Sequence, residues 1–219
     1  MTYIDNVHMI KILFDSELYV VCLKPSGVIS EDKADDNNSL PQLLCKSLGI
    51  DKLFTVHRLD KEVGGVMVYA KTSETAAHFS KQINDGSFKK EYVAEVSGKL
   101  EKKSDELCDL LFHDRARNKT FVVKRKRNGV KEARLEYTLL SYDEITDKST
   151  VRIKLFTGRT HQIRVQLSNI AHPVCGDRKY GAKDNSKPMR LYSYKLSFTD
   201  PQSHKDVTFS AIPEWCENL

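Results

Sequence analysis

The sequence lacks the long apolar stretch that a membrane protein requires. No run of apolar residues approaches the roughly 20 that cross a bilayer, and the N-terminal segment MTYIDNVHMIKILFD carries charges where the apolar part of a secretion signal would lie. The five cysteines are odd in number, widely scattered and without a C-x-x-C pair, as expected of reduced thiols. We therefore expect a cytoplasmic protein with no membrane partner.

Motifs for cofactors and metals are also missing. There is no G-x-G-x-x-G, no Walker loop and no G-x-S-x-G. The seven histidines show neither H-x-x-x-H nor Cys/His zinc spacing, and no acidic cluster resembles a Mg²⁺ or Ca²⁺ loop. We expect no cofactor and no metal, so any chemistry would depend on side chains alone.

The length of the chain and the absence of linkers limit the number of domains. With 219 residues, 40% of them apolar, the chain is long enough for one good core or for two small domains that share a surface. No internal repeat, low-complexity segment or Pro/Gly/Ser-rich linker divides it. We expect a single catalytic domain over residues 1–219.

Apolar periodicity predicts an α+β architecture, a largely antiparallel mixed β-sheet with flanking helices. Three helix or loop signals precede the main strands: a polar loop over 31–39, a helix over 40–48 capped by Ser39 and ended by Gly49, and a helix capped by Ser73 and ended before Gly86. A third helix over 161–169 would be capped by Thr160. Strands are predicted at residues 10–14, 18–23, 66–70, 90–96, 135–139, 151–155, 191–198 and 206–211, with a hairpin turn at 128–129.

Two charged clusters interrupt these apolar segments. In VHRLDKEVGG, Asp60 lies in a turn, where an aspartate often only bonds its own backbone. The glycine pair that follows suits either a tight turn or a close approach of the backbone to a ligand. In FTGRTHQIR, helical spacing places His161, Arg164 and Ser168 on one face. Such a face is normally solvated, but hydrogen-bonding groups at a helix N-terminus also suit an anion or a phosphodiester.

Positive charge is concentrated in one segment. The whole chain has only a modest excess, 35 Lys and Arg against 30 Asp and Glu. Residues 115–134, RARNKTFVVKRKRNGVKEAR, hold nine Lys or Arg and a single acid, Glu132. A solvated hairpin would explain such a stripe, but its charge density favours a nucleic-acid or phosphate partner through counterion release.

Taken together, these pieces resemble the RluA-type family of pseudouridine synthases, in the family's order. VHRLDKEVGGVMVYAKT resembles H-R-L-D-x-x-T-S-G-L-L-L-x-A-K, KKEYVAEVSG resembles K-x-Y-x-A-x-V-x-G, and LFTGRTHQIRVQL resembles L-x-T-G-R-x-H-Q-I-R-x-H-L. The flanking pieces YVVCLKPSGV, AHPVCGDRKYG and KLSFTDP agree as well, so the resemblance covers about residues 12 to 211. It implies the pseudouridine synthase fold.

The sequence departs from the family pattern at three places. Val63 and Gly64 replace the usual Thr-Ser, Gln166 replaces a His, and Tyr192-Ser193 stands where His-Ala is common. These departures bear on loop geometry and substrate choice, because the catalytic positions are unchanged. Many relatives carry an N-terminal S4 RNA-binding module, and we expect this chain to be a catalytic domain without one.

The resemblance implies an enzyme that converts uridine in RNA to pseudouridine without a cofactor. The catalytic carboxylate would be Asp60, kept ionised by Arg164, with Tyr92 against the uracil ring and Arg58 assisting base flipping. Further RNA contacts are expected from the rest of these motifs and from the basic segment, at His57, Arg159, Thr160, His161, Gln162, Lys124, Arg125, Lys126 and Arg127.

Two other functions stay open on the sequence alone. One is an RNA-binding assembly factor of the same fold that has lost catalysis. The other is a nucleoside or glycoside hydrolase, which would require a second carboxylate. The expected partner is structured RNA, either ribosomal or transfer RNA, and the expected oligomeric state is a monomer.

Overall fold

The computed structural model describes residues 10–32 and 38–216. Part of the polar loop predicted over 31–39 therefore lies outside the described residues. The chain forms two compact units, which we describe separately: unit 1 comprises residues 1–89 and 193–211, and unit 2 comprises residues 90–192 and 212–219. Compact units of this kind can belong to one domain or to two, so the single catalytic domain stays a prediction.

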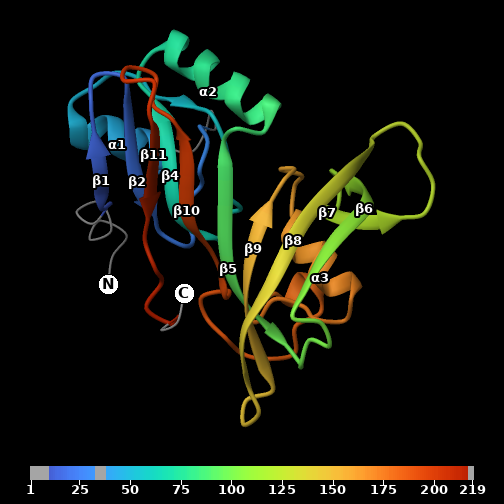
Figure 1. Cartoon of the computed structure of the whole chain (residues 1–219). Coiled ribbons are helices and arrows are strands. Elements are labelled where there is room, and N and C mark those ends of the chain that lie inside the picture. Colours follow the sequence, from blue (N-terminus) through green and yellow to red (C-terminus); the bar gives the residue numbers. More distant parts are fainter. Residues whose placement is uncertain (1–9, 33–37, 217–219) are drawn as a thin grey trace. The chain divides into compact units, whose positions relative to one another are not determined.

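The described part of unit 1 contains two α-helices and an antiparallel group of strands (Figure 1). Its elements are β1 (Ile12–Asp15), β2 (Tyr19–Lys24), α1 (Leu40–Leu48), β3 (Phe54–Thr55), β4 (Gly64–Ala70), α2 (Ser73–Asp85), most of β10 (Leu191–Thr199) and β11 (Asp206–Ser210). Strand β2 pairs with β1 on one side and with β4 on the other, and β3 also pairs with β4. Strand β10 lies next to β4 and pairs with β11.

The core of unit 1 is rich in aromatic rings. All seven residues of β4 are buried, as expected for a strand covered on both faces. Phe79 of α2 packs edge-on against Tyr19 and Phe198, with ring centroids 5.6 and 5.0 Å apart. Such edge-to-face pairs add to the stabilisation from burial alone. Helix α2 is thereby fixed over the strands that carry the first charged cluster.

The helix ends of unit 1 agree with the sequence, but the N-caps differ in detail. Both helices end at a glycine in the left-handed region, Gly49 at φ 66° and Gly86 at φ 77°. Ser39 occupies the N-cap of α1, but its hydroxyl donates to Asp32 instead of capping the helix. The predicted cap at Ser73 is wrong, because Thr72 still has extended backbone and its hydroxyl accepts from the Thr75 amide at 3.1 Å.

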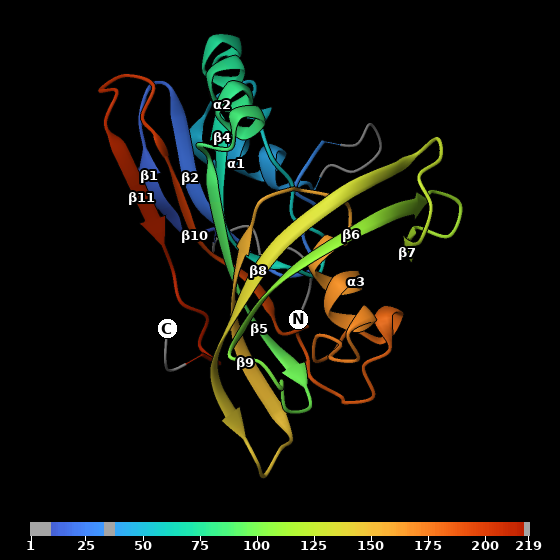
Figure 2. The ribbon, with the colours of Figure 1, turned by 45° about the vertical axis from the view of Figure 1, so that its right-hand side comes forward.

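Unit 2 is a five-stranded antiparallel sheet with one α-helix in its described part (Figure 2). The strand order is β5-β9-β8-β6-β7. Its elements are β5 (Lys89–Ser97, all but the first residue), β6 (Ser104–Asp114), β7 (Lys119–Val123), β8 (Val130–Asp143), β9 (Lys148–Leu155), α3 (Gln162–Asn169) and the 3-10 turn η2 (Arg178–Tyr180). The predicted α+β class, largely antiparallel with most helices early and one late, is confirmed.

The hairpin predicted at Asn128-Gly129 is wrong. Gly129 has a turn conformation with φ 81°, but the strands on either side of it do not pair with each other. Strand β6 pairs with β7 on one edge and with β8 on the other. The hairpin is instead β6–β7, and residues 124–129 form a connection that crosses from one side of β6 to the other.

The third helix begins later than predicted and buries its polar residues. Helix α3 starts at Gln162, with His161 in the N-cap position at a left-handed φ of 55°, so Thr160 is not the cap. Every residue from Gln162 to Leu167 is buried. The polar face is therefore not solvated, because side chains from later in the chain cover it.

Candidate active site

Asp60 lies on a turn between β3 and β4. Hydrogen bonds from other residues of unit 1 hold the backbone of this turn in place. The turn is closed by a hydrogen bond from the Val63 amide to the Asp60 carbonyl, 3.0 Å long. The next carbonyl, that of Lys61, accepts from the Gly27 amide at 2.8 Å and from Lys24 Nζ at 2.9 Å. Asp60 itself is half-buried. The backbone that carries this carboxylate is thus fixed by the KPSG segment that follows β2.

Lys24 is the centre of that support. Its side chain is 1% exposed, and Nζ donates to the carbonyl oxygens of Pro25, Val28 and Lys61 at 2.9, 2.6 and 2.9 Å. Burial lowers the pKa of Lys24 to about 7, and the negative charges of Glu62 and Asp60 act in the opposite direction. A buried amine that titrates near neutral pH is therefore bonded to the backbone of the Asp60 turn.

The two residues before Asp60 differ in their surroundings. His57 is buried, its Nε2 accepts from the Val68 amide at 3.2 Å, and its ring lies 5.6 Å from that of Phe88. Arg58 is exposed and its Nη1 lies 3.2 Å from a carboxylate oxygen of Glu31. Arg58 is thus accessible to RNA, whereas His57 supports β4 at Val68. The RNA contacts of both residues stay predictions.

The glycine pair has a structural explanation that the sequence did not suggest. Gly65 has a φ of 130°, and a Cβ at this position would lie 2.6 Å from the backbone nitrogen of Ser193 and closer still to its carbonyl oxygen. Gly65 therefore allows β4 to approach β10, rather than forming a tight turn.

Tyr92 and Arg164 belong to unit 2. Tyr92 is buried in β5, opposite Ile153 of β9. Arg164, in the first turn of α3, donates from Nε to Asp177 at 2.6 Å and from Nη2 to the other oxygen of the same carboxylate at 2.9 Å. Both side chains of this pair are almost fully buried, with exposures of 8% and 2%. Bidentate geometry of this kind fixes the plane of the guanidinium.

Tyr180 covers the other side of Arg164. The guanidinium lies 5.1 Å from the Tyr180 ring centroid. Burial raises the pKa of the Tyr180 hydroxyl, which is bonded to the Thr120 amide at 2.8 Å and to His161 Nδ1 at 2.9 Å. Asp177 and Tyr180 together hold Arg164 and His161 in one orientation. Both lie in AHPVCGDRKYG, which the sequence analysis recognised without assigning roles, because their contacts with α3 are long-range.

The remaining predicted residues of FTGRTHQIR have two kinds of surroundings. Some bond to the segment that leads into α3, and Arg159 lies near the surface. Gln162 is buried, its Oε1 accepts from the Thr157 hydroxyl and the Arg159 amide, and its Nε2 donates to the Arg134 carbonyl. The Thr160 carbonyl accepts from the Thr120 hydroxyl at 2.8 Å. His161 and Gln162 therefore stabilise the entry to α3.

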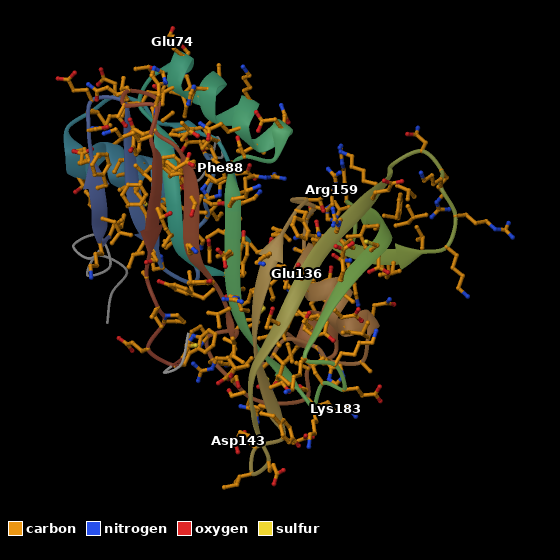
Figure 3. All side chains as sticks on the ribbon, viewed as in Figure 1. Glu74, Phe88, Glu136, Asp143, Arg159 and Lys183 are labelled. Carbon is orange, nitrogen blue, oxygen red and sulfur yellow. The ribbon has the colours of Figure 1, made fainter. Side chains whose placement is uncertain are left out.

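Arg159 lies beside the basic loop, which we define as residues 124–127 (Figure 3). Its Nε donates to the Glu132 carbonyl at 2.9 Å, and it lines an open hollow of about 590 Å³ together with Lys126, Arg127 and Lys131. All four residues of the loop, Lys124, Arg125, Lys126 and Arg127, are exposed. The structure thus brings Arg159 together with two predicted RNA contacts of the loop.

Gln166, which stands where the family has a histidine, is fully buried. Its Nε2 donates to the Leu107 carbonyl at 3.1 Å and to the Asp109 carboxylate at 2.7 Å. The departure from the family pattern therefore lies in the packing of α3 on β6.

Among residues 10–32 and 38–216, no group of three or more His, Cys, Asp or Glu side chains could hold a metal ion.

The sequence of this chain matches a known protein family. Residues 18–169 match the family model described as RNA pseudouridylate synthase. An uncharacterized RNA pseudouridine synthase of Aquifex aeolicus is 31% identical over 95% of this chain and 73% of its own length. A ribosomal large subunit pseudouridine synthase D of Nitrosomonas europaea is 33% identical over 94% of this chain and 62% of its own length. The chain therefore belongs to the RNA pseudouridylate synthase family.

The predicted enzyme class, an RNA pseudouridine synthase and thus an isomerase, is confirmed at the level of this family. The structure of human RNA pseudouridylate synthase domain containing 1 superposes with a TM-score of 0.78 at 22% identity, over 94% of this chain and 84% of that chain. This likeness confirms the predicted pseudouridine synthase fold. The chain spans 73% and 62% of the lengths of these two relatives. In the described part of the chain, no helix has the length and apolarity needed to cross a bilayer.

Proposed function

We propose that this protein isomerises specific uridines in structured RNA, ribosomal or transfer RNA, to pseudouridine. The observation that carries the proposal is the pair of rigidly held charges: Asp60 on a turn fixed by Lys24, and Arg164 fixed by Asp177. A carboxylate must be ionised to act as a nucleophile or base, and a nearby guanidinium favours the ionised form. We propose that residues 1–219 form a single catalytic domain with Asp60, Tyr92 and Arg164 as its catalytic residues.

In the proposed mechanism, Arg58, Asp60 and Tyr92 each take part in a different step of the reaction. The uridine leaves its stack at a cost of a few kcal/mol, assisted by Arg58. Asp60 acts at the sugar, the N1–C1′ bond breaks, the uracil turns, and C5 bonds to C1′. Tyr92 relays the C5 proton while N1 takes up a proton, so the atoms balance and no cofactor is consumed.

The RNA outside the flipped base would be held by exposed cations. These are the cations of the basic loop, and the half-buried Arg159 lines the hollow beside them, where Glu132 pairs with Lys126. Phosphate contacts of this kind fix register without reading sequence. Thr160, His161 and Gln162 support the segment that carries Arg159, and His57 supports β4 in unit 1. We propose that the enzyme acts as a monomer in the cytoplasm.

The activity is tested with RNA that carries tritium at uridine C5. We expect the protein to release tritium, and Asp60→Asn to release none while binding RNA with unchanged affinity. Asp51→Asn, which neutralises an exposed aspartate of the same unit, should keep full release. Equal release by Asp60→Asn would remove Asp60 from its role. Free uracil in place of pseudouridine would identify a hydrolase, and RNA binding without any release would identify an assembly factor.

A further inference from the structure

A second cationic surface lies on unit 2, apart from the basic loop. It is an open hollow of about 600 Å³ between β7, the C-terminal half of α3 and η2, elements that Figure 2 shows on one side of unit 2. We call it the β7–α3 hollow. Its floor includes Val165 and the buried ring of Tyr180, so its shape is set by the same packing that positions Arg164.

Three cations surround the hollow: Lys119, Arg178 and Lys179. Lys119 Nζ lies 5.4 Å from the Tyr180 ring centroid, Lys179 Nζ donates to the Asn118 carbonyl at 3.1 Å, and Arg178 Nη2 donates to the Asn185 amide oxygen. Within residues 10–32 and 38–216, none of the three forms an ion pair with a carboxylate.

The lining of the hollow is suited to an anion. It contains no aspartate or glutamate, whereas the hollow beside the basic loop includes Glu132, which pairs with Lys126. The uncharged polar residues Ser168 and Asn169 complete the rim. The hollow is too open to enclose a small molecule, since small-molecule sites bury most of the ligand surface. An extended polyanion, which needs only point contacts to its phosphates, suits it better.

The position of the hollow relates it to the basic loop. Lys119 begins β7 and the basic loop follows its last residue, Val123. Five residues of strand extend about 17 Å, which corresponds to several nucleotides along one strand of a nucleic acid. The two cationic groups therefore lie at opposite ends of one short strand, at a separation that one RNA can bridge.

We infer that the β7–α3 hollow is a second binding site for RNA backbone phosphates, contacted several nucleotides away from those at the basic loop. The inference rests on the proposed function only in taking RNA as the substrate. The site adds affinity and register without base specificity, because its contacts are to phosphates.

The test compares two variants with the same loss of charge. The site variant combines Lys119→Gln, Arg178→Gln and Lys179→Gln. The control combines Lys99→Gln, Lys102→Gln and Lys103→Gln, three exposed cations in the connection between β5 and β6. Dissociation constants are measured for a transfer RNA transcript and a large ribosomal RNA fragment at about 50 to 200 mM salt. The single variant Arg178→Gln, which changes an exposed side chain, repeats the test if the triple variant does not fold.

The logarithm of the affinity for RNA falls as the logarithm of the salt concentration rises. We expect the site variant to make this slope shallower by about 2 to 3, and the control variant to make it shallower by less than about 1. Equal slopes for the two variants, together with normal tritium release, would overturn the second site but not the activity. No tritium release by the unaltered protein, with the slope difference intact, would overturn the activity but not the site. Stabilisation of the unaltered protein, but not the site variant, by inorganic phosphate, with RNA affinity unchanged, would identify a free-phosphate site and overturn the inference.

Discussion

At the scale of single residues, the candidate site depends on two buried ionisable side chains, Lys24 and Asp177, which fix the positions of other groups. Lys24 joins the Asp60 turn to the segment after β2, because its amine donates to the Lys61 carbonyl of the turn and to the carbonyls of Pro25 and Val28. Asp177 holds Arg164 through two hydrogen bonds. Neither Lys24 nor Asp177 touches a reacting atom in the proposed mechanism, so both are positioning residues. Removing one partner of a buried ion pair leaves the other uncompensated, which costs more than the net stabilisation by the pair.

Asp177→Asn should therefore affect both stability and catalysis. We expect a loss of about 3–5 kcal/mol in the free energy of unfolding and a fall in kcat of about 100-fold, because a small displacement of a catalytic group has a large effect. KM for RNA should change little. Asp105→Asn, which breaks the exposed pair with Lys102, should leave the free energy of unfolding almost unchanged, because solvent screens such a pair. Urea unfolding and tritium-release kinetics measure both effects, and equal behaviour of the two variants would contradict the role of Asp177.

Lys24 should make stability depend on pH. Its pKa is about 7 in the folded protein and about 10.4 in an unfolded chain. Below pH 7 the amine is charged in both states and the cost of burying it is fully present. Between pH 7 and about 10 the folded protein binds fewer protons than the unfolded chain, so this cost is relieved as pH rises.

Relative to Lys24→Met, the unaltered protein should therefore gain stability from pH 7 upward, by as much as about 1.4 kcal/mol per pH unit. Urea unfolding of both proteins at about pH 6, 7.5 and 9 measures the difference. A difference that does not change with pH would mean that the three carbonyl groups keep the ammonium charged throughout.

At the scale of helices and strands, the sequence predicts features that depend on neighbouring residues better than features that depend on distant ones. Glycines and apolar periodicity predicted the ends of α1 and α2 because these depend on neighbouring residues. The cap of α2 was misplaced by one residue, since Thr72 and Ser73 are both suitable caps and only the backbone conformation distinguishes them.

Thr72→Ala and Ser73→Ala should separate the two assignments. We expect Thr72→Ala to lower the free energy of unfolding by about 1 kcal/mol, because the Thr75 amide loses its acceptor. Ser73→Ala should cost only a few tenths, since the Ser73 hydroxyl bonds to an exposed Glu74 carboxylate. Thermal unfolding of both variants measures this, and the reverse order would restore Ser73 as the cap.

The errors at larger separation have one physical cause. Nothing near Asn128-Gly129 indicates that β7 and β8 pair with opposite edges of β6. Likewise the polar residues of α3 are buried by Asp177 and Tyr180, which follow Arg164 by more than ten residues. The resemblance to a family located the residues of the candidate site, but partners such as Lys24 for the Asp60 turn required the fold.

At the scale of the whole molecule, the question is whether the two units behave as one domain. The chain passes between them at residues 89–90, 192–193 and 211–212, and the proposed mechanism needs residues of both. The single tryptophan, Trp215, belongs to unit 2, where its ring lies 5.5 Å from the Arg190 guanidinium. Its fluorescence therefore reports on unit 2 alone.

We expect tryptophan fluorescence and far-UV circular dichroism to give the same midpoint of urea unfolding, because units of one cooperative domain unfold together. Circular dichroism follows the helices of both units, α1 and α2 in unit 1 and α3 in unit 2. Two separate midpoints would instead mean that the chain contains two domains of independent stability.

The position of β7 has a consequence for the protein when no RNA is bound. Strand β7 ends the strand order of unit 2, and its sequence, KTFVV, is mostly apolar. An edge strand of this kind is a template for pairing with a second copy, and flanking charges are a common protection. Lys119 and the basic loop provide such charges at both of its ends. The cations that we propose as RNA contacts would thus also keep molecules of the protein apart, and salt that weakens RNA binding would weaken this mutual repulsion as well.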